Sequence, residues 1–198
     1  MRNSKKIMVY DVEVLRSPDE LATGWSDPWA MGFGTGVVYD YSTGFYYFYS
    51  EERREELVET LVGATLVVGF NQIKFDNYVI IPNNQCKNFW KNYDILLEVV
   101  KSQFGVASIQ EAEQKFGQQE VHDGHLGLDA ISKMTIGMGK TGHGAHAPQL
   151  MREARWAEVY AYNLNDVRLT RKLFDFICQY GYVVDGKGQV IYLTAPTV

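Results

Sequence analysis

The sequence predicts an α/β domain of three layers, and two observations lead to that fold class. Short apolar runs bounded by polar residues, such as 6–14 and 65–70, are typical of buried strands. Apolar residues at spacings of three and four, most regular over 155–180, are typical of amphipathic helices. Strands that alternate with helices favour parallel pairing, and functional residues then collect at the ends of strands.

In the first half of the chain we expect strands over 6–14, 29–39, 44–49 and 65–70, and a helix from Ser50 to about Val62. The first strand begins with four apolar residues, as expected for a central strand covered on both faces. The second and third are joined by a polar turn, Asp40 to Thr43, and predict an antiparallel hairpin. The dense aromatic residues of this hairpin fit strand packing, with stacking on nucleobases as the alternative.

In the second half we expect a strand and then a helix over 93–101, a helix from Leu126, a short helix from Ala147, a long helix over 155–180 and a hairpin over 183–191. Gly181 fits the end of the long helix, and Asp185-Gly186 fits the hairpin turn. The polar segment 103–119 has too little pattern to predict an element. Residues 83–92 suit a lid, the rim of a site for a single strand, or a plain connection.

Composition narrows the class of protein. A net charge of −5 argues against broad wrapping of a nucleic-acid duplex, although acidic metal ligands would account for part of it. Two cysteines are too few for a disulfide framework and favour a reducing, cytoplasmic location. No run is long enough to span a membrane, so we expect a soluble protein without a membrane partner. No repeat or linker interrupts the chain, which predicts a single domain over residues 1–198.

A carboxylate lies in the middle of the apolar face of the long helix. At 100° per residue, this face carries Val159, Tyr162, Asp166, Leu169, Leu173 and Ile177. Moving an ionised carboxylate out of water costs several kcal/mol unless it is paired or bound to a metal. Asp166 is therefore expected to have a partner outside its own helix.

Three further acids stand at the ends of predicted elements. The two-residue period of the first strand puts Asp11 and Glu13 on one face, one pleat apart. Their charges repel each other, and a divalent cation removes that repulsion. Asp76 follows the 65–70 strand, where the next helix begins. Taken singly, the first pair also fits a strand that runs into a polar loop, and Asp76 fits an exposed acid in a first helical turn.

Three motifs occur in order on these elements: Asp11-x-Glu13, Asn71-x3-Phe75-Asp76 and Tyr162-x3-Asp166. Together they resemble the three exonuclease motifs of the DEDD superfamily, which has an RNase H-like fold. The tyrosine four residues before the last aspartate resembles the DEDDy branch. This resemblance implies a mixed, roughly five-stranded sheet flanked by helices.

Other segments extend the resemblance over about residues 6–193. Residues 128–130, 139–142 and 162–176, followed by Gly181-Tyr182 and the hairpin, are similar to bacterial DnaQ-like exonucleases. Those are related to the proofreading domain of family B polymerases and to helicase-associated RNase H-like domains. Val14 departs from the pattern, which often has threonine there. That departure affects local hydrogen bonding to substrate rather than metal binding.

The resemblance implies a metal-dependent 3′ to 5′ exonuclease that shortens single-stranded DNA or RNA and releases nucleoside 5′-monophosphates. Two Mg²⁺ or Mn²⁺ ions would be held by Asp11, Glu13, Asp76 and Asp166. Asp11 would bridge both ions, Glu13 and Asp166 would bind the ion that carries the attacking water, and Asp76 would support the other. Two ions about 4 Å apart stabilise the entering and the leaving oxygen of a phosphodiester displacement.

Three residues would act on the substrate or the water. Tyr162 lies one turn from Asp166 and would orient the attacking water, since a phenol with a pKa of about 10 is a weak base. Asn71 and Phe75 would contact or wedge the terminal nucleotides. Replacing Asp166 by alanine is expected to abolish cleavage and to leave the fold intact.

Two other motifs point to different chemistry. His122-x2-His125 and His143-x2-His146 contain the residue type of a zinc site, but no cysteine or third acid stands at matching spacing. The glycine-rich stretch 137–142 resembles a phosphate-binding loop, but a helix is expected before it and Met134 replaces the first glycine. One hypothesis remains for this loop, that it lets Lys140 reach a substrate phosphate.

Three rival functions remain open. An RNase H-like endonuclease would cut internally, which the tyrosine motif disfavours. A non-catalytic nucleic-acid-binding or scaffold module would serve a helicase or polymerase, and a nucleotide-phosphate binder would use the Gly-Lys-Thr loop. Basic residues on and before the long helix fit either a flank that follows phosphates or a solvated surface: Arg152, Arg155, Arg168, Arg171 and Lys172.

Overall fold

The computed structural model describes residues 5–82, 90–141 and 146–197. In this part of the chain one sheet contains β1 (Ile7–Val14), β2 (Phe33–Asp40), β3 (Phe45–Ser50), β4 (Leu66–Gly69) and β5 (Asn92–Asp94). The strand order is β3-β2-β1-β4-β5. β1 pairs antiparallel with β2 and parallel with β4, while β2 and β3 form an antiparallel hairpin and β4 and β5 pair in parallel. The mixed five-stranded sheet is the predicted one.

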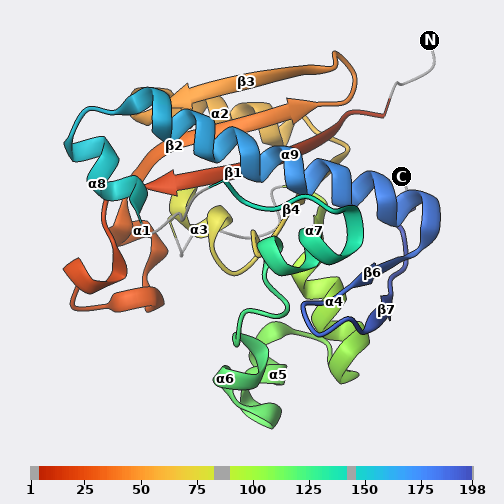
Figure 1. Ribbon diagram of the computed structural model, residues 1–198. Helices are drawn as coiled ribbons and strands as arrows, with labels where there is room; N and C mark the ends of the chain where they lie inside the picture. Colours follow the sequence, from red (N-terminus) through yellow and green to blue (C-terminus); the bar gives the residue numbers. More distant parts are fainter. Residues whose placement is uncertain (1–4, 83–89, 142–145, 198) are drawn as a thin grey trace.

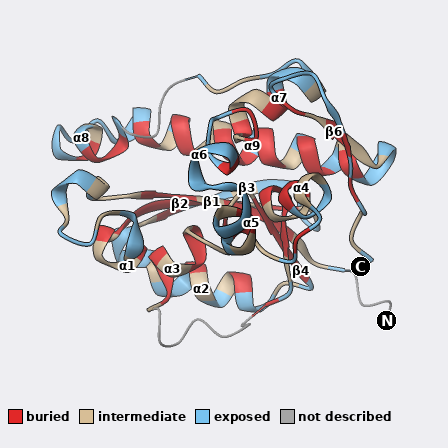
Figure 2. Ribbon diagram, turned by 90° about the horizontal axis from the view of Figure 1, so that it is seen from below, coloured by how far each residue is buried: buried red, intermediate tan, exposed pale blue. Residues whose placement is uncertain are grey.

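Helices cover both faces of this sheet (Figures 1 and 2). One face is covered by α1 (Pro28–Met31), α2 (Arg54–Val62) and α3 (Asp76–Ile80). The other is covered by α4 (Ile95–Phe104), α7 (Leu128–Ile136), α8 (Ala147–Arg152) and α9 (Trp156–Tyr180). A separate hairpin of β6 (Tyr182–Val184) and β7 (Val190–Tyr192) follows α9. The fold is therefore α/β with three layers, consistent with the predicted RNase H-like arrangement.

The alternation of β1 separates two hydrophobic cores. Met8, Tyr10 and Val12 pack with α2 and α3, whereas Val9 packs with α4, α7 and α9. Asp11 and Glu13 follow Val9 in the same two-residue period, so the strand directs both toward α9.

The long helix α9 fits its prediction closely. All six residues of the predicted apolar face are buried, including Asp166. The helix ends at Gly181, whose positive φ of 73° suits the left-handed conformation of a C-cap.

One strand start is predicted wrongly, and one segment without a prediction contains helices. The strand expected from Trp29 begins only at Phe33, because Trp29 belongs to α1, where Pro28 opens a helical turn and Asp27 accepts a hydrogen bond from the Ala30 amide at 3.3 Å. The segment 103–119 contains α5 (Ile109–Phe116) and the start of α6 (Gln118–Val121). The signals for α5 were present in the sequence and were missed: Ser108 caps the helix by accepting a hydrogen bond from the Glu111 amide at 3.1 Å, and Gly117 ends it.

Some predicted features lie outside the described residues. They include most of the 83–92 segment, the last glycine of the 137–142 loop and His143. Among the helices that are described, none combines the length and apolar character that crossing a bilayer requires.

Candidate active site

Three carboxylates from distant parts of the chain meet where β1 and α9 are in contact. One oxygen from each of Asp11, Glu13 and Asp166 lies within 4.8 Å of the other two. Glu13 and Asp166 are 7% and 3% exposed, and Asp11 is half-buried. Asp166 was expected to have a partner outside its helix, and its neighbours from β1 are two further acids. The three negative charges therefore need a positive charge from another part of the protein or from a bound cation.

Burial and mutual repulsion both make these acids hard to ionise. Burial, and then the charges of Asp76, Asp166 and Glu13, hold the pKa of Asp11 well above its ordinary value. Burial and the charge of Asp166 act in the same way on the pKa of Glu13. Burial also raises the pKa of Asp166, although Lys140 opposes the shift. A buried cluster of this kind is strongly stabilised by a bound cation.

Asp76 lies beside this group rather than in it. It is the first residue of α3, and its carboxylate accepts a hydrogen bond from the Val12 amide at 3.2 Å. Burial raises the pKa of Asp76 to about 7. The geometry therefore places three acids around one point and the fourth at the edge of the same cavity.

Lys140 supplies positive charge to the acids. Its Nζ atom donates a hydrogen bond to a carboxylate oxygen of Asp166 and another to the Tyr162 hydroxyl at 3.2 Å. Burial alone would lower the pKa of Lys140, but the charges of Asp166, Tyr162 and Asp11 raise it overall. The second oxygen of Asp166, Oδ1, is buried and has no hydrogen-bond partner among the described residues.

The glycine-rich loop determines where Lys140 lies. It follows α7, a helix as the sequence predicted, and Gly137 ends this helix with a φ of 67°. The Lys140 amide donates to Asp129 Oδ1 at 2.7 Å. A Cβ atom on Gly139 would lie only 2.9 Å from that same oxygen, so glycine permits the close approach. The loop thus directs Lys140 toward the acids.

Asn163 is a site residue that the sequence analysis did not assign. It is fully buried on α9, and its Nδ2 atom donates to Asp11 Oδ2 at 2.6 Å. This hydrogen bond orients the Asp11 carboxylate, and Asn163 itself is not one of the three acids. Asn163 directly follows Tyr162, but nothing in the local sequence indicates that its side-chain amide contacts Asp11 on β1.

All the residues predicted for the site line one cavity of about 570 Å³. They are Asp11, Glu13, Asn71, Phe75, Asp76, Lys140, Tyr162 and Asp166. Tyr162 is 9% exposed, and burial together with Asp166 raises its pKa to about 12. Its hydroxyl is therefore protonated at neutral pH and is suited to orienting a neighbouring group.

The loop that carries Asn71 and Phe75 is held by buried polar contacts. The backbone amides of Asn71 and Ile73 donate to the two oxygens of Asp94, each at 2.9 Å. Gln72 is fully buried and donates to the carbonyls of Val67 and Tyr93. Asn71 has a positive φ of 67°, a conformation that asparagine tolerates better than most residues. Asp94 was another site-supporting residue that the sequence analysis missed, although an acid directly before the apolar start of α4 is a visible capping signal.

The histidines of the described residues lie outside the acidic group. His122 pairs with Glu113 at 2.6 Å, and His125 contacts Asp123. Neither belongs to the group of carboxylates found suitable for a metal among the described residues.

Four of the five basic residues considered as a phosphate-following flank have partners within the protein, including Arg168, which lies over the ring of Tyr46. Arg152 pairs with Glu20 at 2.9 Å and Arg155 with Glu158 at 2.6 Å. Arg171 lies over the ring of Tyr39, 4.5 Å from its centroid. These contacts favour the interpretation of a paired surface.

Comparisons with known proteins show the fold. A family B DNA polymerase from the hyperthermophilic archaeon Pyrobaculum calidifontis superimposes with a TM-score of 0.59 at 16% sequence identity. The similarity covers 88% of this chain but only 25% of the polymerase chain. No protein-family model matches the sequence, and the curated proteins contain no match to it.

The donor set fits a divalent metal. Asp11, Glu13 and Asp166 offer hard carboxylate oxygens close enough to one another to hold one ion. The Oδ1 atom of Asp166, which has no hydrogen-bond partner among the described residues, is one such oxygen.

Proposed function

We propose that this protein is a metal-dependent 3′ to 5′ exonuclease that removes nucleoside 5′-monophosphates from single-stranded DNA or RNA. The observation that carries the proposal is the convergence of four acids and Tyr162 in one cavity, in the order of the DEDDy motifs. Similarity to part of a family B DNA polymerase supports a role in nucleic-acid metabolism, and work beside a polymerase or helicase is part of the proposal.

The acids would hold two Mg²⁺ or Mn²⁺ ions, with Asp11, Glu13 and Asp166 around one and Asp76 supporting the other. Bound ions would lower the pKa of water and neutralise charge on the phosphate. Asn163 holds the Asp11 carboxylate in position through its 2.6 Å hydrogen bond. Asp166 stays available because its Oδ1 atom has no bond within the described part of the protein.

Tyr162 and Lys140 would position the reacting groups. The Tyr162 hydroxyl is one helical turn from Asp166 and remains protonated, so it would orient the attacking water by donating or accepting a hydrogen bond. Lys140 already contacts both residues, and a small movement would let its ammonium group bind a phosphate oxygen of the substrate. Asn71 and Phe75 would hold the terminal nucleotides at the other side of the cavity.

A gel time course tests the proposal. Single-stranded DNA and RNA of equal sequence, labelled at the 5′ end, are incubated with Mg²⁺, Mn²⁺ or EDTA and with wild type or Asp166→Ala. We expect a metal-dependent ladder that shortens one nucleotide at a time and is reduced by at least about 10³-fold in the variant. The variant should keep its fold, since Lys140 retains Tyr162 and the strand acids as neighbours.

The same gel, together with titrations of single-stranded DNA and of ATP, separates the rivals. Products cut in the middle of the chain would favour the endonuclease, and binding without cleavage in any metal would favour the scaffold module. Saturable ATP binding without either result would favour the nucleotide-phosphate binder.

A further inference from the structure

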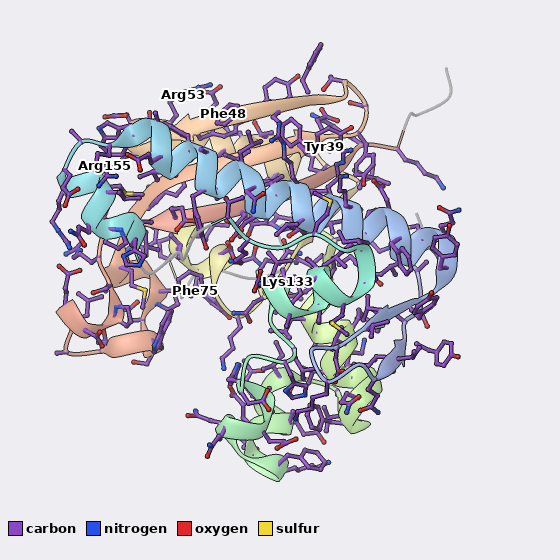
Figure 3. All side chains as sticks on the ribbon, in the orientation of Figure 1. Tyr39, Phe48, Arg53, Phe75, Lys133 and Arg155 are labelled. Atoms are coloured by element: carbon purple, nitrogen blue, oxygen red, sulfur yellow. The ribbon has the colours of Figure 1, made fainter. Side chains whose placement is uncertain are left out.

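A second cavity, of about 610 Å³, lies beside the acidic one. Trp25, Asn71 and Phe75 line both cavities. The remaining walls come from Lys74, just before α3, and from α5, α6 and the residue after α6: Glu113, Gln118, Gln119 and His122. In Figure 3 the labelled Phe75 lies between the red-orange segment that contains residues 24–26 and the green helices α5 and α6. The two cavities are therefore neighbours with a shared aromatic boundary.

The boundary is formed by two rings that a ligand can reach. Trp25 belongs to the short 3-10 helix η2 (Gly24–Ser26) and is 70% exposed. Its ring centroid lies 5.8 Å from that of Phe75, at an angle of 59°. Single exposed aromatic side chains are common on protein surfaces, but this one lines both cavities, where a base could stack on it.

The polar groups of the second cavity are arranged differently from those of the first. Glu113 contacts both Lys74 and His122, so it holds these two side chains in the wall. Gln118 and Gln119 add amides that both donate and accept hydrogen bonds. At the boundary, the Oδ1 atom of Asn71 is buried and has no hydrogen-bond partner among the described residues. The carboxylates of the acidic group are not among the residues that line this space.

We infer that this second cavity binds a nucleobase of the strand whose 3′ end lies in the acidic cavity. The inference rests on the proposed function for the identity of the strand. The volume lies in the usual range for ligand sites, about 300–1,000 Å³. The rings of Trp25 and Phe75 offer stacking surface, while the amides of Gln118 and Gln119 match the donors and acceptors of a base edge. The site would therefore favour flexible single strands of at least two nucleotides.

Binding of abasic oligonucleotides tests this inference without cleavage. Fluorescence anisotropy is measured in EDTA with 5′-labelled single strands that carry one abasic nucleotide, moved stepwise inward from the 3′ end. For wild type we expect the binding affinity to fall by about 10- to 100-fold when the abasic nucleotide stands at one position near the 3′ end. Trp25→Ala should weaken binding of the intact strand by a similar factor and should abolish the loss at that position. Because both changes remove the same contact, their effects should not add.

Two variants serve as controls. Trp156→Ala removes another exposed tryptophan, 41% exposed at the start of α9, which lines neither of these cavities, and it should keep the full position-dependent loss. Trp25→Phe retains an aromatic ring, so the abasic nucleotide should again lower the affinity at that position, by a smaller factor than in wild type. Because Trp25 is highly exposed, we expect Trp25→Ala to keep its fold, and a thermal melt of the variant checks this.

The outcomes separate this inference from the proposed function. Two results would overturn the nucleobase site even if wild type cleaves. One is an equal loss of affinity at that position in wild type and Trp25→Ala, and the other is an affinity of wild type that does not depend on the position of the abasic nucleotide. A loss that depends on Trp25 in a protein that does not cleave would support the site and remove the exonuclease.

Discussion

The two neighbouring cavities share Trp25, Asn71 and Phe75 but differ in charge and in origin. The first gathers Asp11, Glu13, Asp76 and Asp166 around Lys140. The second carries one lysine, one glutamate, two amides and a histidine. In the first cavity the carboxylates repel one another until a cation binds, whereas in the second the charge of Glu113 is paired with Lys74. This contrast suits metal chemistry in one space and base binding in the other.

The elements that build the two cavities differ as well. The acids extend from β1, α3 and α9, which are buried in the two cores. The second cavity is built from η2, the segment before α3 and the short helices α5 and α6. Metal chemistry requires ligands held in fixed positions, while stacking tolerates a less rigid frame. If the two cavities have these separate roles, substitution of a residue that supports the acids should weaken metal binding. The same substitution should leave the affinity for a single strand in EDTA unchanged.

The largest effect in this comparison is expected from Asn163→Ala. The substitution removes the hydrogen bond that orients the Asp11 carboxylate, and the loss of such an outer partner typically costs about 10- to 100-fold in metal affinity. Isothermal titration with Mn²⁺ measures the change. Asn165→Ala, on the same helix and without a bond to the acidic group in the described structure, is the matched control. Equal Mn²⁺ affinities for the two variants would contradict the assignment of Asn163.

The acids of the first cavity could be predicted from the sequence because regular elements carry them. The two-residue period of β1 placed Asp11 and Glu13 on one face, and the helical period of α9 placed Asp166 among buried residues. Spacing along single elements gave the face on which each of these three lies, and the resemblance of the ordered motifs joined them into one predicted site. Their roles as ligands remain a proposal, although the structure brings their oxygens together.

The second cavity could not be predicted in the same way. Trp25 lies in the 3-10 helix η2, which is too short to give a periodic pattern. The capping residues of α5, Ser108 and Gly117, indicated a helix there, but they gave no sign that it would lie beside Trp25. Partners such as Asn163 for Asp11, or Asp94 for Asn71, join residues that are 152 and 23 positions apart. Contacts of this kind follow from tertiary packing, about which a local pattern carries no information.

A smaller effect, in the opposite direction, is expected from Lys140→Met. Its ammonium group occupies an oxygen of Asp166 and repels a cation, so we expect Mn²⁺ affinity to rise by about tenfold while cleavage falls. Lys133→Met is the matched control, because Lys133, labelled in Figure 3, pairs with Asp129 at 2.7 Å in an exposed position on α7. Titration of both variants measures the difference. A lower Mn²⁺ affinity in Lys140→Met than in Lys133→Met would contradict the competition between lysine and metal.

A third effect concerns stability without metal. Burial raises the pKa of Asp76 from an ordinary 3.8 to about 7, so the folded protein binds a proton more tightly than the unfolded chain between these values. The contribution of Asp76 is therefore most favourable at the acid end of this range and is lost as pH rises toward 7, at about 1.4 kcal/mol for each pKa unit.

Urea unfolding between pH 5 and 8 measures this contribution in EDTA. Asp76→Asn should be more stable than wild type at the upper end of the range, and the difference should shrink as the pH falls. Taking the difference between the two proteins removes the effect of other groups, such as His125, whose pKa is lowered by burial. Mg²⁺ should raise the stability of wild type more at pH 8 than at pH 5, because the cation binds the ionised acids. A wild type that exceeds Asp76→Asn most strongly at pH 8 in EDTA would show that the first cavity is not electrostatically strained, and the contrast with its neighbour would fail.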